Sequence, residues 1–271
     1  MLCQEIFGVN AYVREVAELY AEEGYVVLAP DLFWRMQPMV DIGYCAGGVA
    51  EGVRVLPEVR RRCRHQGHRR LRASLRGRPE CTGKVGALGH CLGGKLTYLA
   101  AARAGVDCAV GYYGVGIEGH LNEKDKIRCP LVLHFAGRRH AIARRKRRSQ
   151  IKAAFAEPRR MSRSMSIRRQ DHAFARTMGD HFNKPAALMA HSRSIALFRR
   201  VMGPQYDLSG LWDKHCEYEF GTRDVAATMK TMVAEPYRQP HPDHDRRRRA
   251  ATSWRASTSI TSSTAIRRTP S

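Results

Sequence analysis

Residues 84–103, KVGALGHCLGGKLTYLAAAR, constrain the fold more than any other part of the chain. An apolar run of strand length leads through closely spaced glycines into a segment rich in leucine and alanine, a pattern typical of a helix that packs on a sheet. Apolar runs of similar length occur at 25–32, 108–115 and 129–137. Buried strands that alternate with helices predict an α/β fold with a mostly parallel sheet and helices on both of its faces.

Two further segments have the periodicity of helices. Residues 11–23 place Tyr12, Val16, Leu19 and Tyr20 on one face with acidic residues opposite, and Gly24 follows as a terminator. Residues 191–203 predict a closing helix that ends at a Gly-Pro pair.

Composition excludes several classes of protein. With 43% hydrophobic residues among 271, the chain can build a substantial core. It has no run of eighteen apolar residues and no basic leader followed by an apolar stretch, so neither a membrane span nor a secretory signal is expected. The eight cysteines are scattered without CxxC pairs or zinc-type Cys/His spacing. We therefore expect a cytoplasmic protein with reduced thiols, no bound metal and no membrane partner.

The net charge of +22 is concentrated in three segments, residues 54–78, 138–169 and 238–271. They hold 31 of the 47 basic residues and only four of the 25 acidic residues, which leaves the rest of the chain mildly acidic. Residues 54–78 and 158–170 lack a clean period of 2 or 3.6, so no regular structure is expected there. The tail is low in apolar residues and is predicted to be disordered.

Two origins are open for these arginine-rich segments. They are either stretches translated in a shifted reading frame or contacts for nucleic acid or an acidic surface. The aromatic residues that single-strand binders interleave with basic ones are absent, and no helix-turn-helix pattern accompanies them. We expect no specific nucleic-acid partner. A catalytically dead basic binding protein is kept as an alternative.

Cys91 lies in the frame Gly89-His90-Cys91-Leu92-Gly93, between the predicted strand and helix. This is the cysteine form of a nucleophile elbow, in which small neighbours let strand and helix approach and the thiol projects at the carboxyl edge of the sheet. The backbone N–H of Leu92, at a helix N-terminus, could then stabilise an oxyanion. An ordinary glycine-rich turn with a buried thiol is the competing interpretation.

His172 lies in the segment DHAFAR, 81 residues after Cys91. In hydrolases with such an elbow the histidine comes last in chain order, so His172 is the candidate general base. A histidine with only a packing role is the alternative.

Five segments together resemble the dienelactone hydrolase (carboxymethylenebutenolidase) family: QEIFGVN (4–10), GYVVLAPDLF (24–33), KVGALGHCLGGK (84–95), GYYGVGIE (111–118) and DHAFAR (171–176). The resemblance implies an α/β-hydrolase fold and a Cys-His-Asp triad that opens an enol-lactone ring without a metal or organic cofactor.

The resemblance also implies roles for individual residues. Cys91 matches the nucleophile and His172 the base, and Glu5 matches a carboxylate that holds the resting thiol and helps to ionise it when substrate arrives. The oxyanion donors would be the backbone N–H groups of Ile6 and Leu92. Arg176 matches an arginine that binds the carboxylate of the substrate.

The chain departs from the family pattern in two places. Arg139 occupies the position expected for the triad aspartate, and no acidic residue lies between Gly137 and Gln150. Loss of an orienting acid lowers the rate by roughly four orders of magnitude. The family also has strands before QEIFG, whereas this chain opens with Met1-Leu2-Cys3, so the sheet is expected to lack its first strands and to expose an edge.

The expected organisation is a hydrolase domain over residues 1–203, a partial α+β domain over 204–237 that resembles the start of a SnoaL-like fold, and the basic tail 238–271. The expected function is hydrolysis of a small anionic lactone or ester of dienelactone type, impaired by the missing acid. A general carboxylesterase or thioesterase on the same fold is the runner-up. The chain is expected to be a monomer or a weak homo-oligomer.

Overall fold

The computed structural model describes most of the first 232 residues, namely 1–34, 36–45, 47–48, 50–52, 54, 66–137, 145–156, 162–167 and 169–232. The chain divides into two compact units after Pro204. The expected tail and Arg139 lie outside the described residues.

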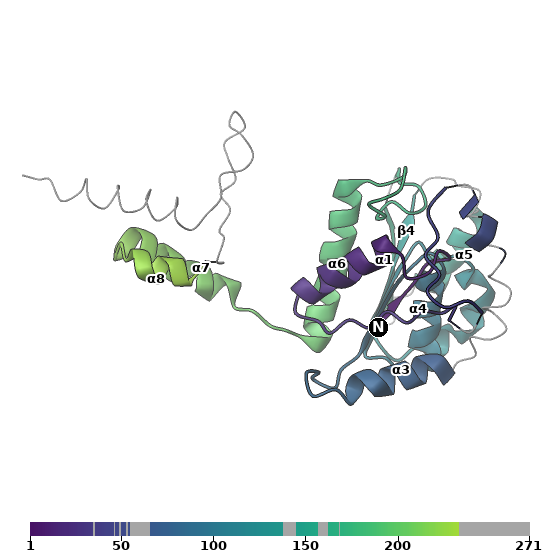
Figure 1. Cartoon of the computed structure of the whole chain (residues 1–271), viewed down its shortest axis with the longest axis horizontal. Helices are drawn as coiled ribbons and strands as arrows, with labels where there is room; N and C mark the ends of the chain where they lie inside the picture. Colours follow the sequence, from purple (N-terminus) through teal and green to yellow (C-terminus); the bar gives the residue numbers. More distant parts are fainter. Residues whose placement is uncertain are drawn as a thin grey trace, which may run out of the picture. The chain divides into compact units, whose positions relative to one another are not determined.

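The first unit is built on a five-stranded sheet in which every pair of neighbouring strands is parallel (Figure 1). Its strands stand in chain order: β1 (Leu2–Cys3), β2 (Gly86–His90), β3 (Cys108–Tyr112), β4 (Leu131–Ala136) and β5 (Ser162–Ile167). Because all neighbouring strands run parallel, the carboxyl ends of all five strands lie at one edge of the sheet. The strands predicted around residues 84–91, 108–115 and 129–137 are confirmed.

Helices cover both faces of the sheet, as predicted (Figure 1). One apolar cluster joins the sheet to α1 (Ala11–Glu22) and α6 (Lys184–Met202). A second joins its other face to α3 (Gln66–Arg76), α4 (Leu92–Arg103) and α5 (Arg145–Ala154). This architecture confirms the predicted α/β fold with a parallel sheet and helices on both of its faces. A short 3₁₀ segment, η1 (Ile117–Lys126), follows β3.

Helix α1 begins at an Asn10 cap, whose side-chain oxygen accepts a hydrogen bond from the backbone of Val13 at 3.2 Å. The predicted apolar face is correct for Tyr12, Val16 and Tyr20, which are buried. Leu19 was wrongly included, because it is 40% exposed. The closing helix is longer than predicted, since Asn183 caps it eight residues before the expected start at 191.

The strand expected over residues 25–32 is not formed, and this prediction was wrong. The carbonyl of Leu28 accepts a hydrogen bond from the N–H of Leu2 at 2.9 Å, but no ladder develops from this contact. The neighbouring strand β1 has only two residues, so it offers too short a partner for the segment to pair along its length.

The prediction that the arginine-rich segments 54–78 and 158–170 lack regular structure was also wrong, because α3 and β5 form within them. Leu71 and Leu75, one helical turn apart, pack α3 onto the core. Strand β5 pairs with β4 over six residues. Two apolar side chains at this spacing thus dock a helix whose other positions are charged, polar or small.

Arginines of α3 fix that helix to the region where α4 ends. Arg69 donates to the carbonyl of Arg103 at 3.1 Å, and Arg72 donates to the carbonyl of Gly105 at 2.8 Å. Arg76 forms an ion pair with Asp107 at 2.8 Å. Cationic groups satisfy the last carbonyls of a helix well, because its C-terminus carries partial negative charge.

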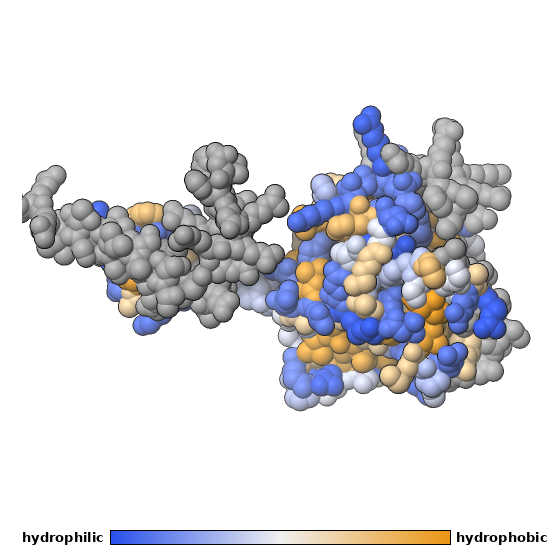
Figure 2. All heavy atoms as spheres, turned by 45° about the horizontal axis from the view of Figure 1, so that its top comes forward, coloured by the Kyte–Doolittle hydropathy of each residue, from blue (hydrophilic) through white to orange (hydrophobic). Residues whose placement is uncertain are grey.

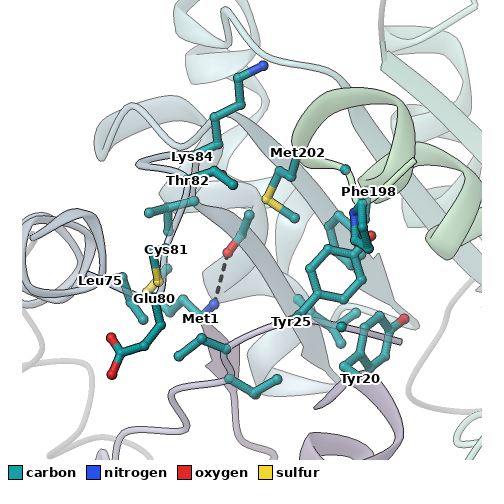
Figure 3. Close-up of a pocket in the computed structure, with 18 of the residues that line it drawn as sticks. Met1, Tyr20, Tyr25, Leu75, Glu80, Cys81, Thr82, Lys84, Phe198 and Met202 are labelled. Atoms are coloured by element: carbon teal, nitrogen blue, oxygen red, sulfur yellow. Dashed lines mark hydrogen bonds between the residues drawn. The ribbon is translucent and has the colours of Figure 1, made fainter. Parts of the chain in front are cut away.

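The first unit contains a cavity of about 190 Å³ where β1 and β2 begin (Figure 3). Tyr25, Phe198 and Met202 are among its apolar walls, whereas the charged ends of Lys84 and Glu80 point away from them (Figure 3). The cavity is therefore at the end of the sheet opposite to the carboxyl edge. On the face drawn in Figure 2, apolar patches interrupt a mostly hydrophilic surface.

The second unit is helical over its described residues, with α7 (Leu208–Cys216), the π-helical turn η2 (Glu217–Gly221) and α8 (Val225–Lys230). His215 ties these elements together, because its ring nitrogens lie 3.1 Å from Glu219 and 2.7 Å from the hydroxyl of Thr231. The resemblance of residues 204–237 to a SnoaL-like domain stays a prediction. Within the described part of the chain, no helix is both long and apolar enough to cross a membrane.

Candidate active site

Cys91 forms a strained turn between β2 and α4. Its backbone has φ 53° and ψ −111°, in the positive-φ region that residues with a side chain rarely adopt. Its N–H donates to the carbonyl of Tyr112 at 3.0 Å, and its own carbonyl accepts from Lys95 at 3.3 Å. Such a conformation costs on the order of 1–3 kcal/mol and persists only where the surroundings enforce it.

Three glycines make this turn sterically possible. A Cβ atom at Gly93 would lie 2.0 Å from the carbonyl oxygen of Cys3, and one at Gly89 would lie 2.4 Å from that of Gly93. A Cβ atom at Gly94 would lie 2.6 Å from the carbonyl oxygen of Tyr112. Helix α4 thus approaches the sheet closely enough to exclude any side chain at these positions.

His90, inside the same sequence frame, is a core residue. Its ring packs against Tyr112 at 4.6 Å and Tyr12 at 5.4 Å between centroids. Burial lowers the pKa of His90 to about 3, so its imidazole is neutral. Its burial among aromatic rings and its low pKa make His90 a poor candidate for the general base.

The candidate residues converge on the carboxyl edge of the sheet. Glu5 follows β1, Cys91 follows β2 and His172 follows β5. The end of β3 connects the last two, because Tyr112 accepts the hydrogen bond from Cys91 and the adjacent Tyr113 meets the His172 ring edge-to-face at 5.0 Å. Ligands of open parallel sheets bind at this edge.

Tyr113 was not singled out from the sequence, although it has two marks of a constrained residue. Its φ is 36°, which is unusual for a residue with a bulky side chain. Its N–H donates to the carbonyl of His134 at 2.6 Å. Nothing in the segment GYYGVG predicts the positive φ of Tyr113 or its hydrogen bond to His134.

Glu5 and Arg176 are brought together directly. The Nη1 atom of Arg176 lies 3.5 Å from Oε2 of Glu5, and the Glu5 side chain is only 1% exposed. Burial raises the pKa of Glu5 to about 7, an effect that the neighbouring Arg176 opposes. Near neutral pH the Glu5 carboxyl therefore exchanges readily between its protonated and ionised forms.

The Cys91 thiol is neutral in this arrangement. Burial is the main cause that raises its pKa to about 12, and the charge of Glu5 adds to it. The backbone N–H of Leu92 and the charge of Arg176 act in the opposite direction. The N–H of Leu92 is thus directed at the Cys91 sulfur.

Ile6, the other expected oxyanion donor, lies in a tight loop closed by an antiparallel bridge between Glu5 and Gly8. Its carbonyl oxygen faces Gly52, where a Cβ atom would lie only 2.6 Å away. Among the described residues, no group of three or more His, Cys, Asp or Glu side chains is placed to hold a metal ion.

Comparisons with known proteins show which family this chain resembles. The dienelactone hydrolase family profile matches residues 1–202. Carboxymethylenebutenolidase of a Pseudomonas species is 33% identical over 206 residues, which cover 74% of this chain and 84% of the relative. The enzyme of the same name from Pseudomonas putida is 32% identical over 208 residues, covering 72% and 82%.

Two solved structures have the same fold. A dienelactone hydrolase-like promiscuous phosphotriesterase from metagenomic libraries superposes with a TM-score of 0.62 at 18% identity, covering 74% of this chain and 85% of that one. A Klebsiella pneumoniae protein superposes with a TM-score of 0.60 at 20% identity, covering 73% and 85%.

Proposed function

Because the chain belongs to the dienelactone hydrolase family of ester and lactone hydrolases, we propose that it opens a carboxylate-bearing lactone or ester through a thioester on Cys91. The observation that carries this proposal is the strained backbone of Cys91 on a glycine-only turn. A buried thiol without a chemical role does not require such a conformation. Strain of this kind gathers at functional sites.

The proposed reaction begins with a neutral thiol. His172, with Glu5 beside the site, removes the proton from Cys91 as its sulfur attacks the substrate carbonyl. The resulting oxyanion accepts hydrogen bonds from the backbone N–H groups of Leu92 and Ile6. Collapse of this intermediate breaks the C–O bond, His172 returns the proton to the leaving oxygen, and a thioester remains on Cys91.

Water completes the cycle. His172 removes a proton from the water as it attacks the thioester, and the carboxylic acid and free thiol are released. For a lactone, the leaving oxygen belongs to the same molecule, so the product is one open-chain acid. Arg176, which is paired with Glu5, supports a substrate that carries a carboxylate at a distance from the reacting ester bond.

The experiment compares hydrolysis of a dienelactone by the parent chain with that by Cys91→Ala and His172→Ala variants. The matched control is Cys81→Ala, because Cys81 is a half-buried free cysteine at the opposite end of the sheet. The proposal requires loss of activity in the first two variants and retention in the control. Activity that persists in Cys91→Ala would refute it.

A further inference from the structure

The guanidinium of Arg176 lies against two neighbouring aromatic rings. Its Cζ atom is 4.1 Å from the centroid of the Tyr44 ring and 5.5 Å from that of Phe7. The two rings meet edge-to-face, with centroids 4.7 Å apart. A planar cation at these distances is attracted by the electron-rich faces of the rings.

Packing contributes to holding Arg176 in place beside its ion pair with Glu5. Its Nε atom is buried and has no hydrogen-bond partner among the described residues. The backbone of Gly179 packs against the Arg176 side chain, because a Cβ atom at Gly179 would lie 2.8 Å from Nε of Arg176. The Nη1 atom of Arg176 lies 3.5 Å from Oε2 of Glu5, so a carboxylate already occupies one side of the guanidinium, where the carboxylate of a substrate would compete with it.

Tyr44 is itself fixed by the start of α1. Its hydroxyl accepts a hydrogen bond from Nδ2 of Asn10 at 2.7 Å. Asn10 is buried, and its side-chain oxygen caps α1 by accepting from Val13. One asparagine therefore links the N-terminus of a core helix to the ring that covers Arg176.

We propose that Tyr44 is a positioning residue that sets selectivity for carboxylate-bearing substrates by holding the Arg176 guanidinium under its ring. This inference rests on the proposed function, in which Arg176 binds the substrate carboxylate. An unstacked arginine would sample many rotamers and would lose conformational entropy on binding. The ring restricts that freedom before substrate arrives and shields the cation from water.

The test uses two esters of similar size, the p-nitrophenyl monoester of glutarate, which carries a carboxylate, and p-nitrophenyl pentanoate, which does not. For Tyr44→Leu we expect KM for the anionic ester to rise about two- to thirty-fold, the range that corresponds to cation–π energies. KM for the neutral ester should stay unchanged. Tyr44→Phe keeps the ring and should retain most of the selectivity.

Asn10→Ser is the matched variant that tests the hydrogen bond from Asn10 to the Tyr44 hydroxyl. Serine preserves the helix cap but removes the amide that holds the Tyr44 hydroxyl, so a smaller loss of selectivity is expected with little change in stability. Thermal unfolding of each variant shows whether it folds. If Tyr44→Leu does not fold, Tyr44→Phe and Asn10→Ser still give the comparison.

A binding measurement separates this inference from the proposed function. Glutarate binding to the Cys91→Ala chain, followed by calorimetry, needs no catalysis. We expect Tyr44→Leu in that background to weaken glutarate binding by the same factor as KM. Equal glutarate affinity with and without Tyr44, or no glutarate binding to either, would overturn the role of Tyr44 whatever the nucleophile proves to be.

Discussion

Gly93 is the position at which the geometry of the elbow is most sensitive to a single methyl group. In Gly93→Ala the new Cβ would lie 2.0 Å from the carbonyl oxygen of Cys3, where ordinary contact begins near 3.4 Å. About 1.4 Å of movement is therefore needed. The atoms in the way belong to the backbone of β1 and the following residue, which cannot swing aside as a side chain could.

The expected loss of stability follows from two opposing effects. Alanine in place of glycine gains roughly 1 kcal/mol of helix propensity. Overpacking a core typically costs about 1–3 kcal/mol, and a clash with backbone belongs at or beyond the upper end. The net loss should be about 2 kcal/mol or more, which for a unit of this size lowers Tm by roughly 4–8 °C.

The assay is urea or thermal unfolding of Gly93→Ala beside Gly67→Ala. Gly67 is an exposed helical glycine in α3, and a Cβ atom there meets nothing within 4 Å, so its replacement should stabilise the chain slightly. Gly93→Ala should also lose hydrolytic activity, because Cys91 moves with the turn. If Gly93→Ala proves as stable as Gly67→Ala, the close approach of α4 to β1 is refuted.

Three other outcomes are expected. Burial raises the pKa of Glu5 from 4.5 to about 7, so the protonated carboxyl stabilises the fold below pH 4.5 and this contribution is lost as pH rises through 7. In urea unfolding at a series of pH values, Glu5→Gln should make the free energy of unfolding depend less on pH over this interval. Leu75→Ala should destabilise the chain by about 2–5 kcal/mol, because Leu75 is 3% exposed and anchors α3, whereas the same assay with Arg70→Ala should show a change within about 0.5 kcal/mol. Arg139→Asp should raise kcat for dienelactone hydrolysis, by up to roughly four orders of magnitude if the substituted carboxylate orients His172; an unchanged kcat would show that no acid is required at this position.

The sequence of β2, the elbow and α4 could be interpreted correctly because its information is local. Gly89, Gly93 and Gly94 are needed where strand and helix come within van der Waals contact, and that need appears directly as a cluster of glycines. The buried strands β3 and β4 are similarly marked by their apolar runs.

The errors arose where partners distant in the chain decide the structure. Residues 25–32 are apolar enough for a strand, but the neighbouring β1 is too short to pair with them. Helix α3 was not predicted because its segment lacks a clean helical period, yet its arginines bind carbonyls and a carboxylate at and after the end of α4, at Arg103, Gly105 and Asp107. Neither kind of partner is visible in a local pattern.

In the candidate site, too, residues within recognisable segments could be predicted, whereas a contact between distant segments could not. Cys91, Glu5 and Arg176 were predicted as site residues from the segments that contain them, and their roles stay predictions. Tyr44 was missed, because nothing in the segment DIGYCAG distinguishes it and its contact with Arg176 joins parts of the chain far apart in sequence.

The most direct test of the account is to trap the acyl intermediate. The parent chain, Cys81→Ala and Cys91→Ala are mixed with an excess of the p-nitrophenyl monoester of glutarate, quenched in acid, digested and examined by mass spectrometry. The account predicts one glutaryl group on the peptide that contains Cys91 in the first two proteins and none in the third. A glutaryl group on another residue, or turnover by Cys91→Ala, would contradict it.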